Sequence, residues 1–514
     1  MATATNDRVL AVDIGTSSVR VIAFEKTGRI VARRRIQYGT IRPRPYFEEQ
    51  DPDAVRDATY RAIRELLGSG GLEAASVAAL SFSSQMYGIF PVDGEGRAIG
   101  NNILWSDGRA EAQAERLKGE LGGLGLYPMT GCPMNSIYPV AKLAWLREEE
   151  GELFARASRF VSIKEYVAAP LVGDWVVDYS MASATGMLDI RRHAWHPEAL
   201  AAAGVKAERL SRPVSGIAPF RLRRDSPLGG LGLRGDLPIF LGGGDGPLAN
   251  LGSGASAVGA VNIDLGTSGA ARAISAAAVT DATASLWCFC LTEELWTYGG
   301  IVTNVGNAYQ WLGANVLCAP APGAAAREGV APDAAYGYLN DLAAKAGAGA
   351  GGLLVLPYLR KARSPYWDGR LKGTIYGLTA DHGAGHIARA LLEAVAYDLR
   401  TILCFMSSRI ATLPHVVLTG GLARSPLLPQ LLADVLDREI RLPEDSEGSV
   451  AGAAILALRG IDAVPDLAFA GGPRSYRSWR PDTAAAAVYD RSYSRYARLV
   501  EALRGLDLDE DGGR

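Results

Sequence analysis

Two stretches of this sequence, VLAVDIGTSSVRVIAFE (9–25) and AVNIDLGTSGAARAIS (260–275), follow the same pattern. Each has a short apolar run that ends in Asp, then a Gly-Thr-Ser turn, and then a second apolar run. Such a pattern predicts two strands joined by a tight turn. Because it recurs in the second half of the chain, it indicates a duplicated domain in which each copy opens with a strand, a turn and a strand.

The turn in each stretch has the residue types that bind phosphate. Glycine lets the backbone approach a phosphate closely, and hydroxyl and backbone N–H groups can donate to its oxygens. Asp13, at the end of the first strand, can hold a magnesium ion, usually through water. A lone Gly-Thr-Ser is typical of an ordinary hairpin turn, whereas two opposed copies can clamp the phosphates of one nucleotide.

Strands and helices alternate along the rest of the chain, which is typical of an α/β fold. Asp51 and Pro52 supply an N-cap and a first-turn proline for one helix. Further strands are predicted over 76–83 and 415–421, and further helices over 108–120, 386–410 and from Ser425 onwards. In HVVLTGG, the backbone of Gly420 and Gly421 can lie against adenine or its ribose, and a tight strand-to-helix turn is the alternative.

A glycine-rich stretch, LGGGDGPLANLGSGAS (241–256), directly precedes the second copy of the turn and is the predicted domain boundary. We therefore expect an N-terminal domain over 8–254, a C-terminal domain over 255–505 and an acidic tail over 506–514. An Ala/Pro/Gly-rich loop over 319–336 has no assigned purpose.

Composition narrows the class of protein. The 514 residues suffice for two large domains, and 48% hydrophobic with 21% charged residues is typical of a soluble globular protein. A net charge of −2 gives no electrostatic reason to expect nucleic acid or a membrane surface as partner. MATATND lacks the features of a signal peptide and no apolar run is long enough to span a bilayer, so we expect a cytoplasmic protein. The five cysteines are scattered, and Cys288 and Cys290 are interpreted as alternating strand residues rather than metal ligands.

Further motifs extend over nearly the whole chain. They are WSDGR (105–109), YPVAKLAWLREE (138–149), GDG (244–246), GGIVTNVGNAYQWL (299–312), RSPYWD (363–368), GTIYGLTADHGAGHIARALLE (373–393) and TGGLARSP (419–426). Together with the two turns, and in this order, they resemble the FGGY carbohydrate kinases. Ile137 and Leu391 depart from the residues usual in the family signatures.

The resemblance implies two ribonuclease-H-like domains of the actin-like ATPase type with an interdomain cleft, sugar bound mainly by the first and ATP mainly by the second. Asp245 matches the catalytic aspartate, which accepts the proton of the attacking hydroxyl during phosphoryl transfer. Without the resemblance it would be interpreted as a polar turn residue, and Arg20 as a solvated strand residue. The positions that match nucleotide binding are Gly15, Thr16, Ser17, Arg20, Gly266, Thr267, Ser268, Gly306, Gln310, Gly420, Gly421 and Ser425, with Asp13 as the Mg²⁺ ligand.

The sugar pocket is expected in the first domain, because a polyol needs polar partners beside an apolar wall. The substrate-binding candidates are Gln85, Met86, Tyr87, Trp105, Asp107, Arg109 and Gly246. Met86 and Trp105 can equally be plain core, and Asp107 with Arg109 a charge pair at a helix N-terminus. The stretches 85–110, 130–146, 161–167, 176–190 and 244–255 look most like gluconate kinases, with xylulose kinases next. Met86-Tyr87 stands in place of the Arg-Glu pair of glycerol kinases, which argues against glycerol.

One departure bears on the substrate. Many gluconate- and xylulose-type members carry a histidine where this chain has Tyr87, which keeps a hydrogen-bond donor and acceptor but loses the imidazole. A carboxylate substrate would favour a fixed cation, and Arg109 and Lys164 are the nearest candidates in sequence.

The main hypothesis is an ATP-dependent kinase for a linear sugar or sugar acid, with gluconate preferred and xylulose or another pentulose or polyol second. An actin-like ATPase without a sugar substrate is the alternative from another class, and a catalytically weak sugar sensor is a third. Asp245 and the sugar-pocket motifs distinguish the kinase from the ATPase, and the presence of Asp13, Asp245 and both phosphate turns argues against the sensor. The expected partner is a small molecule, and a homodimer is one option for the oligomeric state.

Overall fold

The computed structural model describes residues 8–69, 72–317, 332–360, 362–407, 415–444, 447–470 and 475–506. Its contacts divide the chain into two units. The first contains 1–258, 274–298 and 445–474, and the second contains 259–273, 299–444 and 475–514. The predicted domains differ from these units mainly because residues 274–298 and 445–474 belong to the first unit. The N-terminal MATATND, most of the 319–336 loop and all but the first residue of the 506–514 tail lie outside the described residues.

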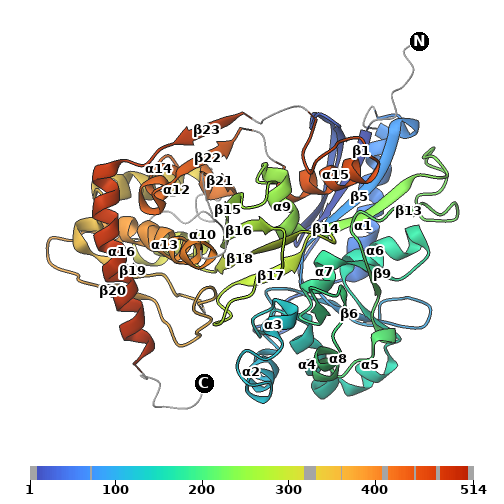
Figure 1. Cartoon of the computed structure of the whole chain (residues 1–514), viewed down its shortest axis with the longest axis horizontal. Coiled ribbons are helices and arrows are strands. Elements are labelled where there is room, and N and C mark those ends of the chain that lie inside the picture. The colour runs from blue at the N-terminus through green and yellow to red at the C-terminus, as the bar shows by residue number, and fades with distance from the viewer. Residues whose placement is uncertain are drawn as a thin grey trace, which may run out of the picture. The chain divides into compact units, whose positions relative to one another are not determined.

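The first unit is built on a six-stranded mixed sheet (Figure 1). β1 pairs antiparallel with β2 and parallel with β5, and β5 pairs parallel with β14. The predicted hairpin over 9–25 and strand over 76–83 are confirmed. The strand order is β13-β14-β5-β1-β2-β3, with the bounds Phe220–Arg221, Pro238–Gly244, Val77–Ser84, Arg8–Ile14, Ser18–Glu25 and Ile30–Gln37.

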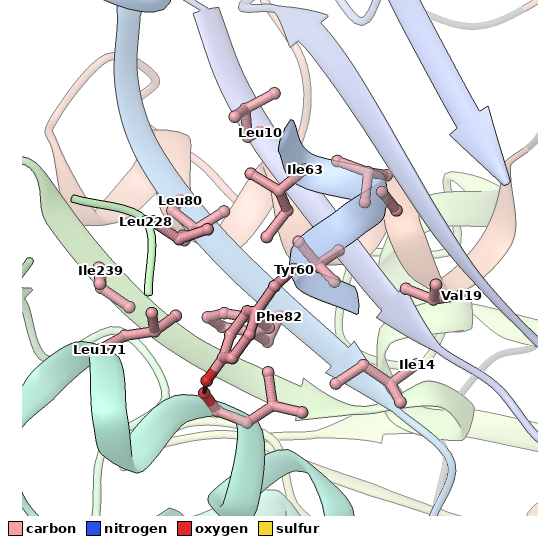
Figure 2. Close-up of a cluster of buried hydrophobic side chains, with 14 of the residues drawn as sticks. Leu10, Ile14, Val19, Tyr60, Ile63, Leu80, Phe82, Leu171, Leu228 and Ile239 are labelled. Atoms are coloured by element: carbon pink, nitrogen blue, oxygen red, sulfur yellow. Dashed lines mark hydrogen bonds between the residues drawn. The ribbon is translucent and has the colours of Figure 1, made fainter. Parts of the chain in front are cut away.

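Strand β1 is apolar on both sides, and so both of its faces are covered. Because side chains alternate along a strand, Leu10, Val12 and Ile14 all face one cluster. Figure 2 shows this cluster, to which α1 (Pro52–Ser69) and α6 (Ile163–Val172) contribute apolar side chains. As predicted, Asp51 caps α1 by accepting from the N–H groups of residues 53 and 54.

The opposite face of β1, with Val9 and Ala11, packs against two other helices. These are α9 (Asp245–Ser253) and α15 (Gly448–Gly460). The two helices cross with their backbones in contact, because a Cβ on Gly252 would lie 1.6 Å from the carbonyl oxygen of Gly448. Likewise, a Cβ on Gly452 would lie 2.1 Å from that of Leu248. Glycine is therefore required at the crossing.

The remaining elements of the first unit lie outside the six-stranded sheet. The predicted helix over 108–120 is α2, and the CFC stretch forms strand β17. Their bounds are β4 (Glu49–Gln50), β6 (Phe90–Val92), β7 (Asn102–Ile103), α2 (Glu111–Glu120), α3 (Tyr127–Thr130), α4 (Pro139–Glu149), α5 (Gly151–Arg156), β8 (Arg159–Val161), β9 (Val176–Asp178), α7 (Tyr179–Ser183), β10 (Leu188–Asp189), β11 (Ala194–Trp195), α8 (Pro197–Ala203), β12 (Arg212–Val214) and β17 (Trp287–Cys290).

The second unit repeats the pairing pattern of the first. β15 pairs antiparallel with β16 and parallel with β21, which pairs parallel with β22, and β22 pairs antiparallel with β23. The series β2-β1-β5-β14-β13 has the same sequence of directions. The duplication predicted from the two turns is therefore visible in the topology. The bounds are β15 (Val261–Leu265), β16 (Gly269–Ser275), β21 (His415–Thr419), β22 (Glu439–Pro443) and β23 (Tyr476–Trp479).

The helices of the second unit follow the predictions with one correction. The helix predicted over 386–410 is α13 (Ala384–Ser407), and its last predicted residues lie outside the described ones. The helix predicted from Ser425 begins later, as α14 (Leu428–Leu436), because a short 3-10 turn comes first and the Ser425 hydroxyl accepts from the N–H of Leu428. The other elements are β18 (Trp296–Val302), α10 (Gly306–Trp311), α12 (Pro332–Lys345), β19 (Leu354–Leu356), β20 (Thr374–Tyr376) and α16 (Thr483–Arg504).

A buried carboxyl group lies between α13 and α16. Asp398 accepts hydrogen bonds from the hydroxyls of Tyr358 and Tyr496, both at 2.9 Å. Burial raises the pKa of Asp398 to about 7, against the opposing effect of the two tyrosine hydrogen bonds. The folded state therefore favours the protonated carboxyl group.

This carboxyl group predicts a pH dependence of stability. Because the pKa is raised in the folded state, the stabilisation is present below the unfolded pKa and is lost as pH rises through about 7. Asp398→Asn, which cannot ionise, should gain stability relative to the wild type by up to about 4 kcal/mol between pH 4 and pH 8. Chemical denaturation at both pH values measures this difference. The exposed Asp381→Asn is the control, and an equal difference at both pH values would contradict the prediction.

Among the described residues, no helix combines the length and apolarity needed to cross a bilayer.

Candidate active site

The first turn joins β1 to β2 and places an ion pair at its base. Asp13 lies opposite Arg20 in the β1–β2 register, and the Arg20 Nη2 is 2.6 Å from the Asp13 Oδ2. The other oxygen of Asp13 accepts from the hydroxyl of Ser449, at the start of α15, at 3.0 Å. The turn is closed by the N–H of Gly15, which donates to the Ser18 carbonyl at 3.0 Å. The turn and its aspartate are thus held before any ligand binds.

Acidic groups surround Arg20. Burial by itself lowers the pKa of Arg20, but Asp13, Glu447 and Asp245 outweigh this effect and raise it. The Glu447 carboxylate lies 3.7 Å from the Arg20 Nη1. Arg20 is therefore a cation paired with Asp13 and within range of the Asp245 charge, and its contact with the transferred phosphate stays a prediction.

Four further polar side chains connect the first turn to the predicted sugar segments. The Trp105 indole N–H donates to the Thr16 hydroxyl at 3.1 Å, and that hydroxyl donates to the Gln85 Oε1 at 3.2 Å. Gln85 in turn donates to the Gln50 Oε1 at 2.7 Å, and Asn102 donates to the same oxygen at 3.2 Å. The structure thus brings together Thr16, Gln85 and Trp105, which were predicted from separate motifs.

Tyr87 has an unusual backbone conformation. Its φ of 68° lies in the left-handed region, which residues other than glycine rarely adopt. Its ring makes edge contacts with Tyr138 and Phe289, at centroid distances of 5.6 and 6.1 Å. The buried Lys142 Nζ donates to the Tyr87 carbonyl at 2.9 Å and to the Leu104 carbonyl at 2.7 Å. Lys142 therefore joins the backbone of the 85–87 segment to that of the 104–105 segment.

Asp107 and Arg109 contact each other and the rest of the first unit. The Arg109 Nη2 lies 2.7 Å from Asp107 and 2.6 Å from Glu49, and the Arg109 side chain is 5% exposed. Its guanidinium stacks 3.9 Å above the ring of Phe47. Both residues hold the loop before α2 in place, and their contact with substrate stays a prediction.

Lys164 is not positioned to bind a substrate carboxylate. It is 1% exposed, and its ammonium lies 2.6 Å from the Asp178 carboxylate. The sequence alone did not reveal this because the partner lies in a separate strand.

Asp245 is the first residue of α9 and directly follows β14. Its Oδ1 accepts from the N–H of Gly246 at 2.8 Å. A Cβ on the preceding Gly244 would lie 2.6 Å from the side chain of Met86, so these two segments are in contact. Met86 therefore lies beside Gly244, the residue before Asp245, and the contact of Met86 and Gly246 with substrate stays a prediction.

The second turn has the predicted neighbours in the second unit. The N–H of Gly306 donates to the Gly266 carbonyl, and that of Asn307 to the Thr267 carbonyl, both at 3.1 Å. Gln310 lies one helical turn further along α10 and is exposed. Residues 266–267 and 306–307 therefore lie side by side, and their contact with nucleotide stays a prediction.

The Gly420-Gly421 pair lies against the same turn. Gly420 has a φ of 93°, and a Cβ there would lie 2.3 Å from the Leu265 carbonyl oxygen, directly before the turn. Glycine is needed both for the conformation and for the close approach. The Ser425 hydroxyl donates to Asn340 at 3.1 Å and so fixes the following loop.

Several residues of these sites carried no signal in the sequence. Ser449 and Glu447 contact the first turn although they lie late in the sequence. Gln50 and Asn102 lie outside the two turns, and Lys142 lies within the 138–149 motif without a role of its own. Their role depends on contacts between distant segments, which local spacing does not show. In the described part of the chain, no three His, Cys, Asp or Glu side chains gather as an all-protein metal site.

Family models cover both halves of the chain. Residues 8–252 match the N-terminal domain of the FGGY family of carbohydrate kinases, and residues 261–461 match its C-terminal domain. The chain therefore belongs to the FGGY family of carbohydrate kinases, and it has the two-domain α/β fold and the ATP-dependent sugar kinase activity of that family.

Individual relatives agree with this assignment. The gluconokinase of Bacillus licheniformis is 34% identical over 451 residues, which cover 88% of this chain and 87% of that protein. A xylulose kinase of Staphylococcus epidermidis is 26% identical over 515 residues, 98% of each chain. The crystal structure of gluconate kinase from Lactobacillus acidophilus superposes with a TM-score of 0.89 at 27% identity, covering 97% of this chain and 98% of that one.

Proposed function

We propose that this kinase transfers the γ-phosphoryl group of ATP to a hydroxyl of gluconate. The assignment of gluconate as the substrate rests on the likeness to gluconokinase. That likeness is 34% identity, against 26% for xylulose kinase over a similarly large part of the chain. Xylulose or another pentulose is the second candidate, because a xylulose kinase is 26% identical over 98% of this chain.

In the proposed mechanism, Asp245 is the general base. It accepts the proton from the attacking sugar hydroxyl as the γ-phosphoryl group is transferred in line. Its position at the start of α9, beside Met86 and Gly246, supports this role. Arg20 supplies a fixed positive charge close to Asp245, which would stabilise charge on the transferred phosphoryl group.

The remaining residues bind and orient the two substrates. Gln85, Trp105 and Thr16, joined by hydrogen bonds, are proposed to line the sugar side together with Tyr87. In the second unit, the turn over 266–268 is proposed to bind phosphate, and Gly306, Gln310, Gly420, Gly421 and Ser425 to border the nucleoside. The contacts of Gly306 with Gly266 and of Gly420 with Leu265, directly before the turn, support one continuous nucleotide site.

Mg²⁺ fits this donor set with Asp13 as its protein ligand. Asp13 supplies a single buried carboxylate, and Mg²⁺ in kinases commonly takes its other ligands from phosphate oxygens and water. When bound, the ion would neutralise charge on the β- and γ-phosphates. Asp13 itself is oriented by Arg20 and Ser449.

We also propose that the enzyme works in the cytoplasm, where ATP is supplied, and a homodimer stays a prediction for its oligomeric state.

The test of this function is sugar-stimulated release of ADP from ATP. Gluconate, xylulose, ribulose, glycerol and erythritol are compared, and we expect the highest kcat/KM for gluconate. Glucitol is the matched control, because it has a hydroxymethyl group where gluconate has its carboxylate. If the carboxylate is bound by polar groups, glucitol should be poorer by about tenfold or more.

Each other result has a defined meaning. A higher kcat/KM for xylulose would replace gluconate as the substrate and leave the kinase assignment in place. Equal rates with gluconate and glucitol would show that the carboxylate is not recognised. No stimulation by any of these compounds would contradict the proposed function and favour an ATPase that acts without sugar.

A further inference from the structure

The end of strand β14, just before Asp245, has an irregular path. Its register with β5 shifts between Phe240 and Gly243, which marks a β-bulge. Within the bulge Gly242 has a φ of 64°, and a Cβ there would lie 1.9 Å from the Phe82 carbonyl oxygen. The bulge changes the direction in which the carbonyl groups of Leu241 and Gly243 point. Such bulges occur beside active sites, where they redirect the chain.

One buried lysine contacts both of these carbonyl groups. The Lys164 Nζ, on α6, donates to the Leu241 carbonyl at 3.0 Å and to the Gly243 carbonyl at 2.8 Å. The third oxygen beside it is that of Asp178, at 2.6 Å. Burial lowers the pKa of Lys164, and the negative charges of Asp178, Glu165 and Asp245 oppose that effect.

A serine holds the other side of the same peptide group. The N–H of Gly244 donates to the Ser180 hydroxyl at 3.1 Å. The Gly243 carbonyl and the Gly244 N–H belong to one peptide plane, so Lys164 and Ser180 fix that plane from both ends. Asp178 accepts from the N–H of Met181 at 3.0 Å as the N-cap of α7, the helix that carries Ser180. The lysine and the serine are thus joined through Asp178.

The free energy of folding does not explain why the Lys164–Asp178 ion pair is buried. Two charges buried in this way lose their hydration, and a buried ion pair adds little net stability compared with apolar side chains of similar size. Gly244, which follows the fixed plane, has no side chain to restrict its own rotation. Without Lys164 and Ser180, the backbone leading into Asp245 would have a wider choice of directions.

We propose that Lys164, Asp178 and Ser180 are positioning residues for Asp245. They fix the peptide plane between residues 243 and 244, and so they set the direction from which the Asp245 carboxylate meets the sugar hydroxyl. This role rests on the proposed function of Asp245 as the general base. A displacement of about 1 Å at a catalytic group can cost about a hundredfold in rate, so a device that fixes the preceding peptide affects turnover directly.

Lys164→Met tests the proposal, because methionine keeps much of the side-chain volume but removes the ammonium. We expect kcat to fall by about tenfold to a hundredfold, while the KM values for ATP and sugar stay within about threefold. The assay uses the full-length enzyme and the sugar with the highest kcat/KM in the panel above. Lys142→Met is the matched comparison, since Lys142 is also a buried lysine bonded to carbonyl groups but contacts the sugar segments. It should raise the KM for sugar instead.

Two further variants distinguish a positioning role of Lys164 from simple charge balance and from an effect on folding. The double variant Lys164→Met/Asp178→Asn removes both charges and keeps an oxygen at position 178 to cap α7. If the pair only balanced charge, this variant would recover kcat; we expect it to stay as slow as Lys164→Met. Ser180→Ala deletes a single hydroxyl, so it decides the question even if the lysine variants do not fold. It should lower kcat severalfold without changing either KM.

The outcomes are distinct from those of the proposed function. Wild-type enzyme that no sugar stimulates would contradict the proposed function, and with it this role of Lys164. Sugar-stimulated wild-type enzyme with unchanged kcat in Ser180→Ala and Lys164→Met would overturn the positioning role alone. Equal changes of kcat and both KM values in Lys164→Met and Lys142→Met would also overturn it, because they would indicate a general loss of structure.

Discussion

Replacing Asp245 by Asn is expected to lower kcat by about a hundredfold or more. Asparagine has nearly the same size and can still accept the hydrogen bond that Gly246 donates, so the start of α9 should keep its conformation. It cannot take up the proton of the attacking hydroxyl. The KM for ATP and the affinity for ADP should therefore change little, which steady-state kinetics and calorimetric titration with ADP would measure.

The control for this variant is Asp236→Asn. Asp236 is an exposed aspartate just before β14 that pairs with Arg234, and it lies outside the proposed site. It should retain wild-type kcat. Turnover by Asp245→Asn at the wild-type rate would remove Asp245 from the role of base, and the other carboxylates near Arg20 would then have to be tested in its place.

The second large effect is expected from Gly252→Ala. Its methyl group would lie 1.6 Å from the Gly448 carbonyl oxygen, and backbone cannot move aside as a flexible side chain can. Helices α9 and α15 would have to separate, at a cost of about 3 kcal/mol or more. Because α9 begins with Asp245 and α15 carries Ser449 to Asp13, kcat should fall together with Tm. Thermal denaturation and the ADP-release assay measure the two effects.

Gly119→Ala is the matched control, because it makes the same change at a helical glycine where a Cβ meets nothing within 4 Å. Alanine is the better helix former, so Tm should stay the same or rise slightly. If Gly252→Ala and Gly119→Ala had the same Tm, the close contact between the two helices would not be essential to the fold.

The parts of the fold predicted correctly are those that depend on local pattern. The two Asp-x-Gly-Thr-Ser turns, the strands on either side of them and the start of the helix at Pro52 are each specified by neighbouring residues, through alternation, turn chemistry and capping. The equal order of pairings in the two units followed from the recurrence of one short motif.

The features that were missed depend on which distant segments meet. Lys164 was a candidate for binding a substrate carboxylate until the structure placed it against Asp178 and two carbonyl groups of β14. The segment that carries Ser449 follows the whole second sheet except its last strand, and yet its hydroxyl orients Asp13. The helix predicted from Ser425 starts later because the serine hydroxyl accepts from the N–H groups of Leu427 and Leu428 in the turn before the helix. In each case a contact between segments, or the geometry of one turn, decided the role of the residue.

The late position of α15 in the sequence has a consequence for synthesis of the protein. This helix covers the β1, β5 and β14 face of the first unit, yet it is translated only after most of the second unit. While the ribosome is still adding residues before 448, Val9, Ala11 and Phe240 have no α15 to cover them. Between the synthesis of β14 and that of α15, the nascent chain therefore lacks the helix that covers this apolar face, and transiently exposed apolar surface of this kind is prone to aggregation. Completion of the first unit is thus tied to the last part of translation.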